Sequence, residues 1–390
     1  MPRSAWYGPA NVSITVRFPL LAAMPALVTL HLAFAGVPAV QAQAQASPAA
    51  PRNPQALYRD ACAACHGLDG RGAPQGAVGF DVPLPDFADC SFATREPDAD
   101  WLAVAHQGGP IRGFDRRMPA FGEVLTDDEL GRALVHIRGF CQDAAWPPGE
   151  LNLPRALVTE KAYPEDEAVL TTTVGSGDAG VVTNQFLYEK RIGARSQYEV
   201  AVPVAFAESS PGTWERGLGD IAVAFKHTVW HSVDTGGIFS VAGEVVLPTG
   251  KESRGLGKGV TIVEPFAAYG QILPAGSFFH AQAGAELSTD RDTAEHEAFW
   301  RAAVGRTWEQ GRFGRAWSPM VEILGAREIE SGATAHWDIV PQVQVTLNQR
   351  QHVMINGGVR VPLNDRDSRD PQVIVYLLWD WFDGGLWDGW

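Results

Sequence analysis

The stretch that decides the fold of most of this chain is YEVAVPVAFAE, at residues 198–208. Along it Tyr, Val, Val, Val and Phe alternate with Glu, Ala, Pro, Ala and Ala. Alternation with a period of two residues predicts a β-strand, because successive side chains of a strand point to opposite faces. One face of this strand is apolar, and the other is small or charged.

The same alternation recurs between residue 168 and residue 383. About twelve such segments begin near residues 168, 181, 196, 218, 237, 261, 277, 297, 316, 335, 351 and 371. Each is roughly 10–14 residues long, whereas ordinary strands average about 5–6 residues. Tilted transmembrane strands need about 9–11 residues, and bacterial barrels of one chain have an even number of strands. We therefore predict an all-β antiparallel transmembrane barrel of about 12 strands over residues 155–390.

A soluble β-sandwich is the alternative for this region. Its outward face would be rich in Lys and Thr, whereas here the second face is mostly Ala and Gly with isolated charges. Small residues lining a narrow lumen explain that composition better. Aromatic residues at the predicted strand ends agree with the girdles of a membrane barrel. They are Trp230, Trp300, Trp308, Trp337, Trp379, Trp381 and Trp390.

The composition of the whole chain points to two unlike domains. Its 390 residues are 45% hydrophobic and 19% charged, with a net charge of −14. These values exclude a disordered chain and a nucleic-acid binder with a basic surface, so we expect no nucleic-acid partner. All 4 Cys lie between residues 62 and 141, while most of the 13 Trp lie beyond residue 200.

The N-terminus has the layout of a secretory signal peptide. Residues 1–46 contain no Asp or Glu, carry Arg3 and Arg17, run apolar from Phe18 to Val40 and end in AQAQA. A basic flank, an apolar segment and an A-x-A site are typical of a cleaved signal. An uncleaved anchor is the alternative, which the prolines within the apolar run disfavour. Secretion places the rest of the chain in the bacterial periplasm and outer membrane.

The strongest local motif is CAACH at residues 62–66. Two thiols spaced C-x-x-C and followed by His are the attachment signature of c-type haem. A thioredoxin-like redox pair would need a βαβ context, and zinc would need further Cys or His ligands at matching spacing. We predict one covalently attached haem c, with thioethers from Cys62 and Cys65 and with His66 as an axial ligand.

Met118 is the predicted second axial ligand. It lies in RMPAFG at residues 117–122, ahead of a helix whose start is marked by a capping box of Thr126 and Glu129. A thioether opposite His raises the reduction potential of the iron and suits electron transfer. The alternatives, His106 and His136, fall within helical segments.

Cys90 and Cys141 form an even pair in an oxidising compartment, which predicts a disulfide. Two buried free thiols are the alternative.

Two resemblances follow from these motifs. The CAACH run, the MPAFG loop and the helix at 127–140 resemble class I monohaem cytochromes c. This implies a helical domain at 47–148 wrapped round the haem, with Arg112 or Arg116 near the propionates. The motifs GLGD at 217–220, LPTGKE at 247–252 and LN at 363–364 resemble outer-membrane barrels of the transporter and phenol meta-pathway porin type. The complete arrangement resembles the fused cytochrome–porins associated with iron oxidation.

The combination predicts a haem-binding electron-transfer protein of the bacterial outer membrane, with its haem domain on the periplasmic side. It would pass electrons between periplasmic carriers and a donor or acceptor at the barrel, within outer-membrane lipid. Ferrous iron is one such donor, because inward carboxylates could attract cations; the simpler explanation is ordinary lumen polarity. The carboxylates are Glu199, Glu244, Glu264 and Glu286.

A porin-like barrel that transports a solute, with a tethered cytochrome as redox partner, is the alternative. No enzyme is predicted, because the sequence shows no nucleophile–base pair or carboxylate dyad, and Met ligation would fill the sixth iron position.

Overall fold

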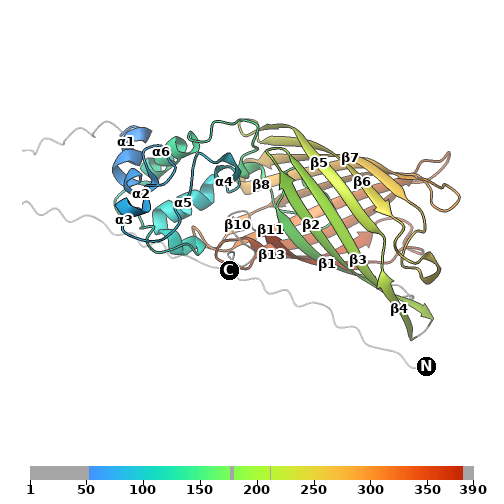
Figure 1. The fold of residues 1–390 in the computed structure, drawn as a ribbon. Coiled ribbons are helices and arrows are strands. Elements are labelled where there is room, and N and C mark those ends of the chain that lie inside the picture. The colour runs from blue at the N-terminus through green and yellow to red at the C-terminus, as the bar shows by residue number, and fades with distance from the viewer. Residues whose placement is uncertain (1–51, 176–179, 211, 381–390) are drawn as a thin grey trace, which may run out of the picture. The chain divides into compact units, whose positions relative to one another are not determined.

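The computed structural model describes residues 52–175, 180–210 and 212–380. The signal peptide expected at 1–46, and the two predicted girdle residues Trp381 and Trp390, lie outside the described residues. The described residues belong to one compact unit, in which helices come first and strands follow (Figure 1).

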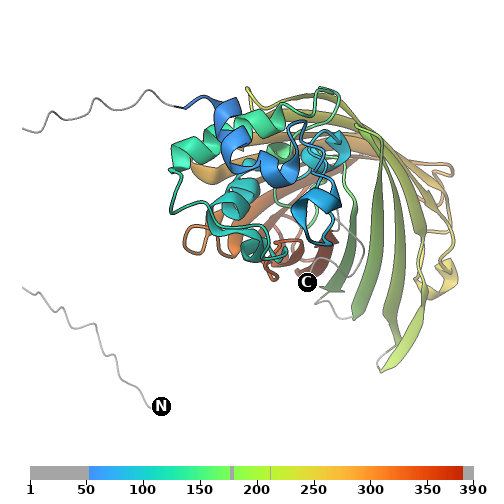
Figure 2. The ribbon, with the colours of Figure 1, turned by 60° about the vertical axis from the view of Figure 1, so that its left-hand side comes forward.

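The first part of the chain is helical, as predicted, and Figure 2 shows its short helices gathered together. None of the described helices is long and apolar enough to cross a membrane. The helices are α1 (Pro54–Ala61), α2 (Ala63–His66), α3 (Gln75–Val78), α4 (Cys90–Ala93), α5 (Asp98–Gln107) and α6 (Asp127–Arg138), with 3₁₀ turns η1 (Gly109–Arg112) and η2 (Gly149–Leu151).

Local chemistry explains where the two principal helices begin. Asn53 caps α1 by accepting a hydrogen bond from the backbone N–H of Ala56 at 2.7 Å. The predicted capping box starts α6, where Thr126 and Glu129 satisfy each other's backbone N–H groups. The two helices pack together through buried apolar residues. These are Leu57, Leu125, Leu130 and Ala133.

Within the described residues, twelve long strands close into an antiparallel barrel. Each pairs with the next long strand along the chain, and β14 pairs back with β1 through Thr171 and Tyr376. The strands are β1 (Glu167–Gly175), β2 (Val181–Ile192), β3 (Ser196–Ser210), β5 (Ile221–Ser232), β6 (Gly237–Leu247), β7 (Ile262–Leu273), β8 (Ser277–Ser288), β9 (Glu297–Arg306), β11 (Ala316–Glu328), β12 (His336–Thr346), β13 (Val353–Pro362) and β14 (Gln372–Asp380). Two short pieces, β4 (Thr213–Leu218) and β10 (Trp308–Glu309), extend this wall.

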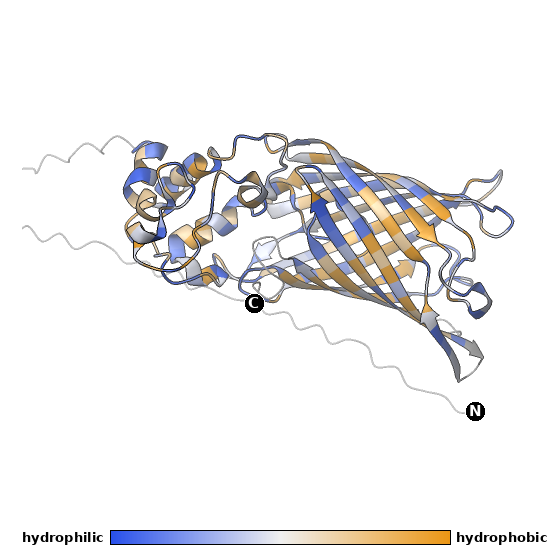
Figure 3. Ribbon diagram, in the orientation of Figure 1, coloured by the Kyte–Doolittle hydropathy of each residue, from blue (hydrophilic) through white to orange (hydrophobic). Residues whose placement is uncertain are grey.

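The outward face of the barrel is apolar. Along the strands, hydrophobic and hydrophilic residues alternate as predicted (Figure 3). Large apolar side chains such as Phe225, Val304 and Ile323 are about half exposed, while Glu199, Lys226 and Glu322 on the other face are buried. An apolar belt of this size is stable only in apolar surroundings, as in the hydrocarbon region of a bilayer.

Tryptophans mark both rims of the apolar belt. Trp230, Trp308 and Trp379 lie near one end of the barrel, where Trp317 joins them opposite Trp308. At the other end Trp300 and Trp337 flank Gly325 in the strand register, and their rings lie 5.5 Å apart. These six tryptophans therefore lie where aromatic girdles are expected.

The connections at the two ends of the barrel differ in length. At one end the turns are short, as at residues 193–195, 233–236 and 274–276. At the other end the connections at 248–261 and 363–371 are longer.

The lumen differs from the sequence expectation. Small residues were expected to line a narrow channel, but the inward faces also carry large buried polar side chains such as Lys226, His280 and Tyr376. The reason is that residues 152–166, which precede β1, form no strand and lie inside the barrel, in contact with its inward side chains.

Candidate functional site

The predicted haem-binding residues occupy one short turn of the chain. Cys62 joins α1 to α2, and Cys65 and His66 end α2. The backbone N–H of His66 donates to the Cys62 carbonyl at 3.0 Å, and both thiols are free. Gly67 follows with φ +74°, a left-handed value that favours glycine. This tight turn brings the two thiols and the imidazole together.

His66 is held by aromatic neighbours. Its ring stacks on Phe87 with the centroids 4.8 Å apart, and the Tyr58 hydroxyl donates to the Gly67 carbonyl at 2.7 Å. Burial lowers the pKa of His66 to about 4, so the ring is neutral at pH 7 and keeps a free lone pair. Burial and the neighbouring Cys65 raise the pKa of Cys62 to about 11.

The donor set fits a covalently attached haem. Two free thiols and an imidazole lie within five consecutive residues, and the Nδ1 atom of His66 is buried without a hydrogen-bond partner. Elsewhere in the described chain, the one cluster of possible metal ligands is Glu160, Glu189 and Glu199. That cluster is already occupied by the cationic side chains of Arg155 and Lys226.

Met118 lies in the loop between η1 and α6. Its N–H donates to the Asp115 carbonyl at 3.1 Å, and its carbonyl accepts from Gly109 at 3.0 Å. A side chain at Gly108, which has φ +82°, would lie 2.9 Å from that same carbonyl. The loop therefore depends on two adjacent glycines, and ligation by Met118 stays a prediction.

The two alternative histidines have other neighbours. His106 lies 3.1 Å from the Arg312 guanidinium and 2.8 Å from the Gln107 amide. The His136 ring packs against the rings of Tyr58 and Phe140. His106 therefore has polar partners within the protein, whereas the contacts of the His136 ring are aromatic.

The structure joins Cys90, at the start of α4, to Cys141, just beyond α6, in a disulfide. The bond closes a sequence separation of 51 residues and ties the middle of the helical domain to its last helix.

Ion pairs that the sequence did not reveal attach the helical domain to the barrel. Arg95 pairs with Asp166 at 2.7 Å, just ahead of β1, and Arg312 pairs with Asp127 at 2.6 Å. Glu96 pairs with His352 at 2.9 Å, in the turn between β12 and β13. The barrel partners all lie at the end with the short turns, and contacts between such distant residues leave no local sequence signal.

Arg112, one of the two arginines expected near the propionates, has partners within the protein, and the propionate contact stays a prediction. Arg112 is buried, donates to the Asp100 carboxylate at 2.6 Å and donates to the Phe313 carbonyl at 2.7 Å. Burial and the nearby Glu96 carboxylate raise the pKa of Asp100 to about 6. Arg116 is exposed.

The predicted lumen carboxylates fall into two groups. Glu199 is buried and lies 3.7 Å from the Lys226 ammonium. Glu244 and Glu264 lie directly opposite each other on β6 and β7, and Glu286 pairs with Lys258 at 2.9 Å. Lysine ammonium groups therefore lie beside Glu199 and Glu286, whereas Glu244 and Glu264 place two carboxyl groups side by side in the lumen wall.

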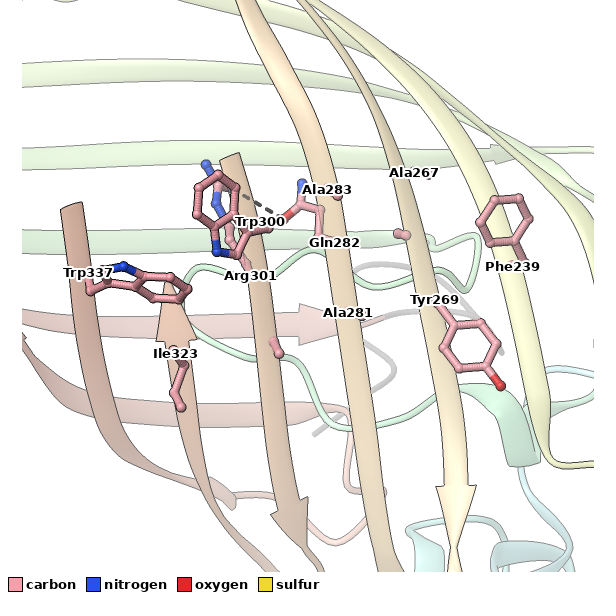
Figure 4. A pocket seen from close by; sticks show the side chains of 12 residues that line it. Phe239, Ala267, Tyr269, Ala281, Gln282, Ala283, Trp300, Arg301, Ile323 and Trp337 are labelled. Carbon is pink, nitrogen blue, oxygen red and sulfur yellow. Dashed lines mark hydrogen bonds between the residues drawn. The ribbon is translucent and has the colours of Figure 1, made fainter. Parts of the chain in front are cut away.

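The barrel wall also carries an apolar groove on its outer face. Figure 4 shows Trp300 beside Trp337, and Arg301 hydrogen-bonded to Gln282 at 3.2 Å. The floor of the groove is made of small residues, and its sides are aromatic. The residues include Ala267, Ala281, Ala283, Ala302, Phe239, Tyr269 and Ile323.

Comparison with known proteins agrees with this division of the chain. Residues 49–137 match the family described as cytochrome c oxidase, cbb3-type, subunit III. They form a c-type cytochrome domain, which implies haem c. No curated protein matches the sequence.

Solved structures similar to the chain include porins and an outer membrane channel. KdgM porin is 8% identical with a TM-score of 0.36, over 55% of this chain and 99% of its own. An outer membrane channel from Pseudomonas putida is 13% identical with a TM-score of 0.41, over 58% and 99%. NanC porin is 7% identical with a TM-score of 0.38, over 55% and 98%.

Proposed function

We propose that the protein is an electron-transfer protein of the bacterial outer membrane that carries one haem c, covalently attached. Cys62 and Cys65 would form the thioethers, and His66 and Met118 would be the axial ligands. When bound, the haem supplies reversible one-electron chemistry. The observation that carries the proposal is a c-type cytochrome domain fixed by ion pairs to a closed β-barrel within one chain.

The side chains around the motif prepare this site for electron transfer. The stacking of Phe87 orients the His66 ring, and burial keeps the ring neutral, as a metal ligand must be. A thioether opposite the imidazole fills the sixth iron position, which suits electron exchange better than ligand activation.

The ends of the barrel support a periplasmic position for the cytochrome domain. Outer-membrane barrels have short periplasmic turns and longer extracellular loops. The ion-pair partners Asp166, Arg312 and His352 lie at the end with the short turns. The cytochrome domain would therefore exchange electrons with periplasmic carriers.

A donor outside the cell would have to enter the extracellular half of the lumen. The reason is that one haem cannot carry electrons across about 30 Å of hydrocarbon. The opposed carboxylates Glu244 and Glu264 would favour a cationic donor such as ferrous iron there. Each ferrous ion that becomes ferric gives up one electron to the protein.

Stopped-flow absorbance of the purified holoprotein in proteoliposomes of known orientation tests this function. With the loops facing out, external ferrous iron should reduce the haem, and a periplasmic carrier enclosed in the vesicle should reoxidise it. The double variant Glu244→Gln/Glu264→Gln should slow the first step and leave the second unchanged. A haem that no external donor reduces would contradict electron exchange through the barrel, and solute transport would then be the better account.

A further inference from the structure

Residues 152–166, named here the inner segment, are the connection between the cytochrome domain and β1. Most of their side chains are buried, although the segment has neither helix nor strand. Its backbone groups must therefore find hydrogen-bond partners outside regular secondary structure. They find them on the inward faces of the barrel strands, all the way round the lumen.

The first contacts are made by Arg155. Its guanidinium pairs with Glu167 on β1 and with Glu189 on β2. Its carbonyl accepts hydrogen bonds from Asn356 on β13 at 3.3 Å and from the Tyr376 hydroxyl on β14 at 2.7 Å. One residue thus bridges four neighbouring strands.

Glu322 on β11 holds the middle of the inner segment. Its carboxylate accepts from the N–H groups of Leu157 at 3.0 Å, Val158 at 3.1 Å and Thr159 at 2.6 Å. The Thr159 hydroxyl donates to the same carboxylate at 2.6 Å. Gln342 on β12 accepts from Leu157 as well, at 3.0 Å. A fully buried carboxylate with this many donors is an anchor for the chain that crosses the lumen.

Side chains on β5, β6 and β8 hold the next residues of the inner segment. Lys226 on β5 donates to the Glu160 carboxylate at 2.7 Å, and Gln282 on β8 accepts from the Glu160 N–H at 3.1 Å. Ser240 on β6 donates to the Ala162 carbonyl.

The remaining strands are contacted as well. Gln197 on β3 accepts from the Glu165 N–H at 2.5 Å, and Arg301 on β9 donates to the Val158 carbonyl at 3.5 Å. On β7, Ala268 belongs to one apolar cluster with Ala162 and Tyr163 of the inner segment, and a Cβ at Gly270 would lie 3.4 Å from a methyl carbon of Leu153. That cluster consists of Leu151, Ala162, Tyr163, Ile238 and Ala268.

We propose that the inner segment is a plug that closes the barrel to solutes. It contacts every one of the twelve long strands described above. The inward side of every strand is therefore joined to the inner segment. A twelve-stranded barrel is intermediate between filled eight-stranded barrels and open sixteen-stranded porins, so one buried chain with its side chains is enough to fill it. The barrel is then a membrane anchor whose extracellular vestibule is closed at its inner end by the plug.

Conductance in planar lipid bilayers tests the plug with the full-length holoprotein. The natural protein should show no stable open-channel currents. Its heat-modifiable gel mobility should show that the barrel is folded. A variant with residues 153–164 replaced by a Gly/Ser chain of equal length should show open-channel steps. Steady open channels in the natural protein would overturn the plug, and so would a silent replacement variant whose barrel is folded.

Single substitutions give a graded test. Glu322→Ala removes the acceptor of four hydrogen bonds from the inner segment and should produce transient openings. Glu328→Ala, on the exposed end of the same strand, is the matched control and should stay silent. Equal conductance in both variants would overturn the anchoring role of Glu322.

Thiol labelling provides a measurement that is independent of conductance. In intact cells, Ala156→Cys should resist a membrane-impermeant maleimide, because Ala156 is buried among lumen residues. Ser331→Cys, in the exposed connection between β11 and β12, should be labelled rapidly. Equal labelling rates would overturn the plug. These readouts do not involve the haem, so they separate failure of the plug from failure of the proposed electron transfer.

Discussion

At the scale of single residues, the proposed axial ligand Met118 would set the reduction potential of the haem site. Met118→Leu should abolish the absorbance band of thioether-ligated ferric haem and lower the reduction potential, because Met ligation raises it. Visible spectroscopy and a redox titration of the purified protein measure both effects. Met354→Leu, in the barrel strand β13, is the control and should change neither. An unchanged spectrum in Met118→Leu would show that another residue is the ligand.

Arg155 is the residue on which the buried charges of the inner segment depend most. Arg155→Leu leaves the carboxylates of Glu167 and Glu189 without their shared cation. Removing one partner of a buried ion pair costs about 3–5 kcal/mol. The urea concentration at which heat-modifiable mobility is lost should fall accordingly. Arg327→Leu, exposed on β11, should leave that concentration almost unchanged, and equal losses in the two variants would contradict this account.

The sequence predicts the residues of the proposed haem site because they are adjacent. Cys62, Cys65 and His66 form a complete local pattern, and their chemistry is fixed by their spacing. The contacts of Arg112 could not be predicted in the same way. Its partners, Asp100 and the Phe313 carbonyl, are 12 and 201 residues away, and only the folded chain brings them together.

At the scale of elements, the capping box should stabilise α6 measurably. Thr126→Ala removes the hydroxyl that accepts from the Glu129 N–H, and loss of such a cap costs about 1 kcal/mol. Thermal unfolding of the cytochrome domain, followed by haem absorbance, should shift to lower temperature. The exposed Gln142→Ala in the same domain should leave it unchanged. No difference between the two variants would contradict a role for the cap.

The same helix gives a pH dependence with a definite sign. The hydrogen bond from the Thr126 N–H, together with Arg52, lowers the pKa of Glu129 from 4.5 to about 2. The unfolded state therefore binds this proton more readily, so the contribution to stability is present above about pH 4.5 and is lost as the pH falls towards 2. The thermal unfolding midpoint of the cytochrome domain, measured at several pH values in this range, should fall less steeply with decreasing pH in Glu129→Gln than in the natural protein. Identical slopes would contradict the assignment.

Strands and the inner segment differ in how well sequence reveals them. The strand starts near 181, 196, 237, 277, 297 and 316 agree with prediction because alternation is a local property. The first strand was expected near residue 168 and β1 begins at Glu167, but the position of residues 155–166 inside the lumen was not expected. No periodicity marks residues 152–166, since their partners lie on strands spread over the following two hundred residues.

At the scale of the whole molecule, the chain joins a c-type cytochrome domain to a closed twelve-stranded barrel through a segment inside the lumen. Ion pairs such as Arg95–Asp166 hold the two domains together at the end with the short turns. If the plug closes the lumen, electrons but not solutes would pass between the extracellular vestibule and the periplasm. In this account the barrel anchors the protein in the membrane and the cytochrome domain transfers the electrons, so both domains serve one function.

Membrane fractionation of cells that express the full chain tests this account most directly. Outer-membrane fractions should contain a single band that stains for haem and whose mobility changes on heating, because one polypeptide would carry both the covalent haem and the folded barrel. Cys62→Ala/Cys65→Ala should remove the haem stain and leave the heat-modifiable band in place. A haem-stained protein of full length in the soluble periplasm would contradict the account.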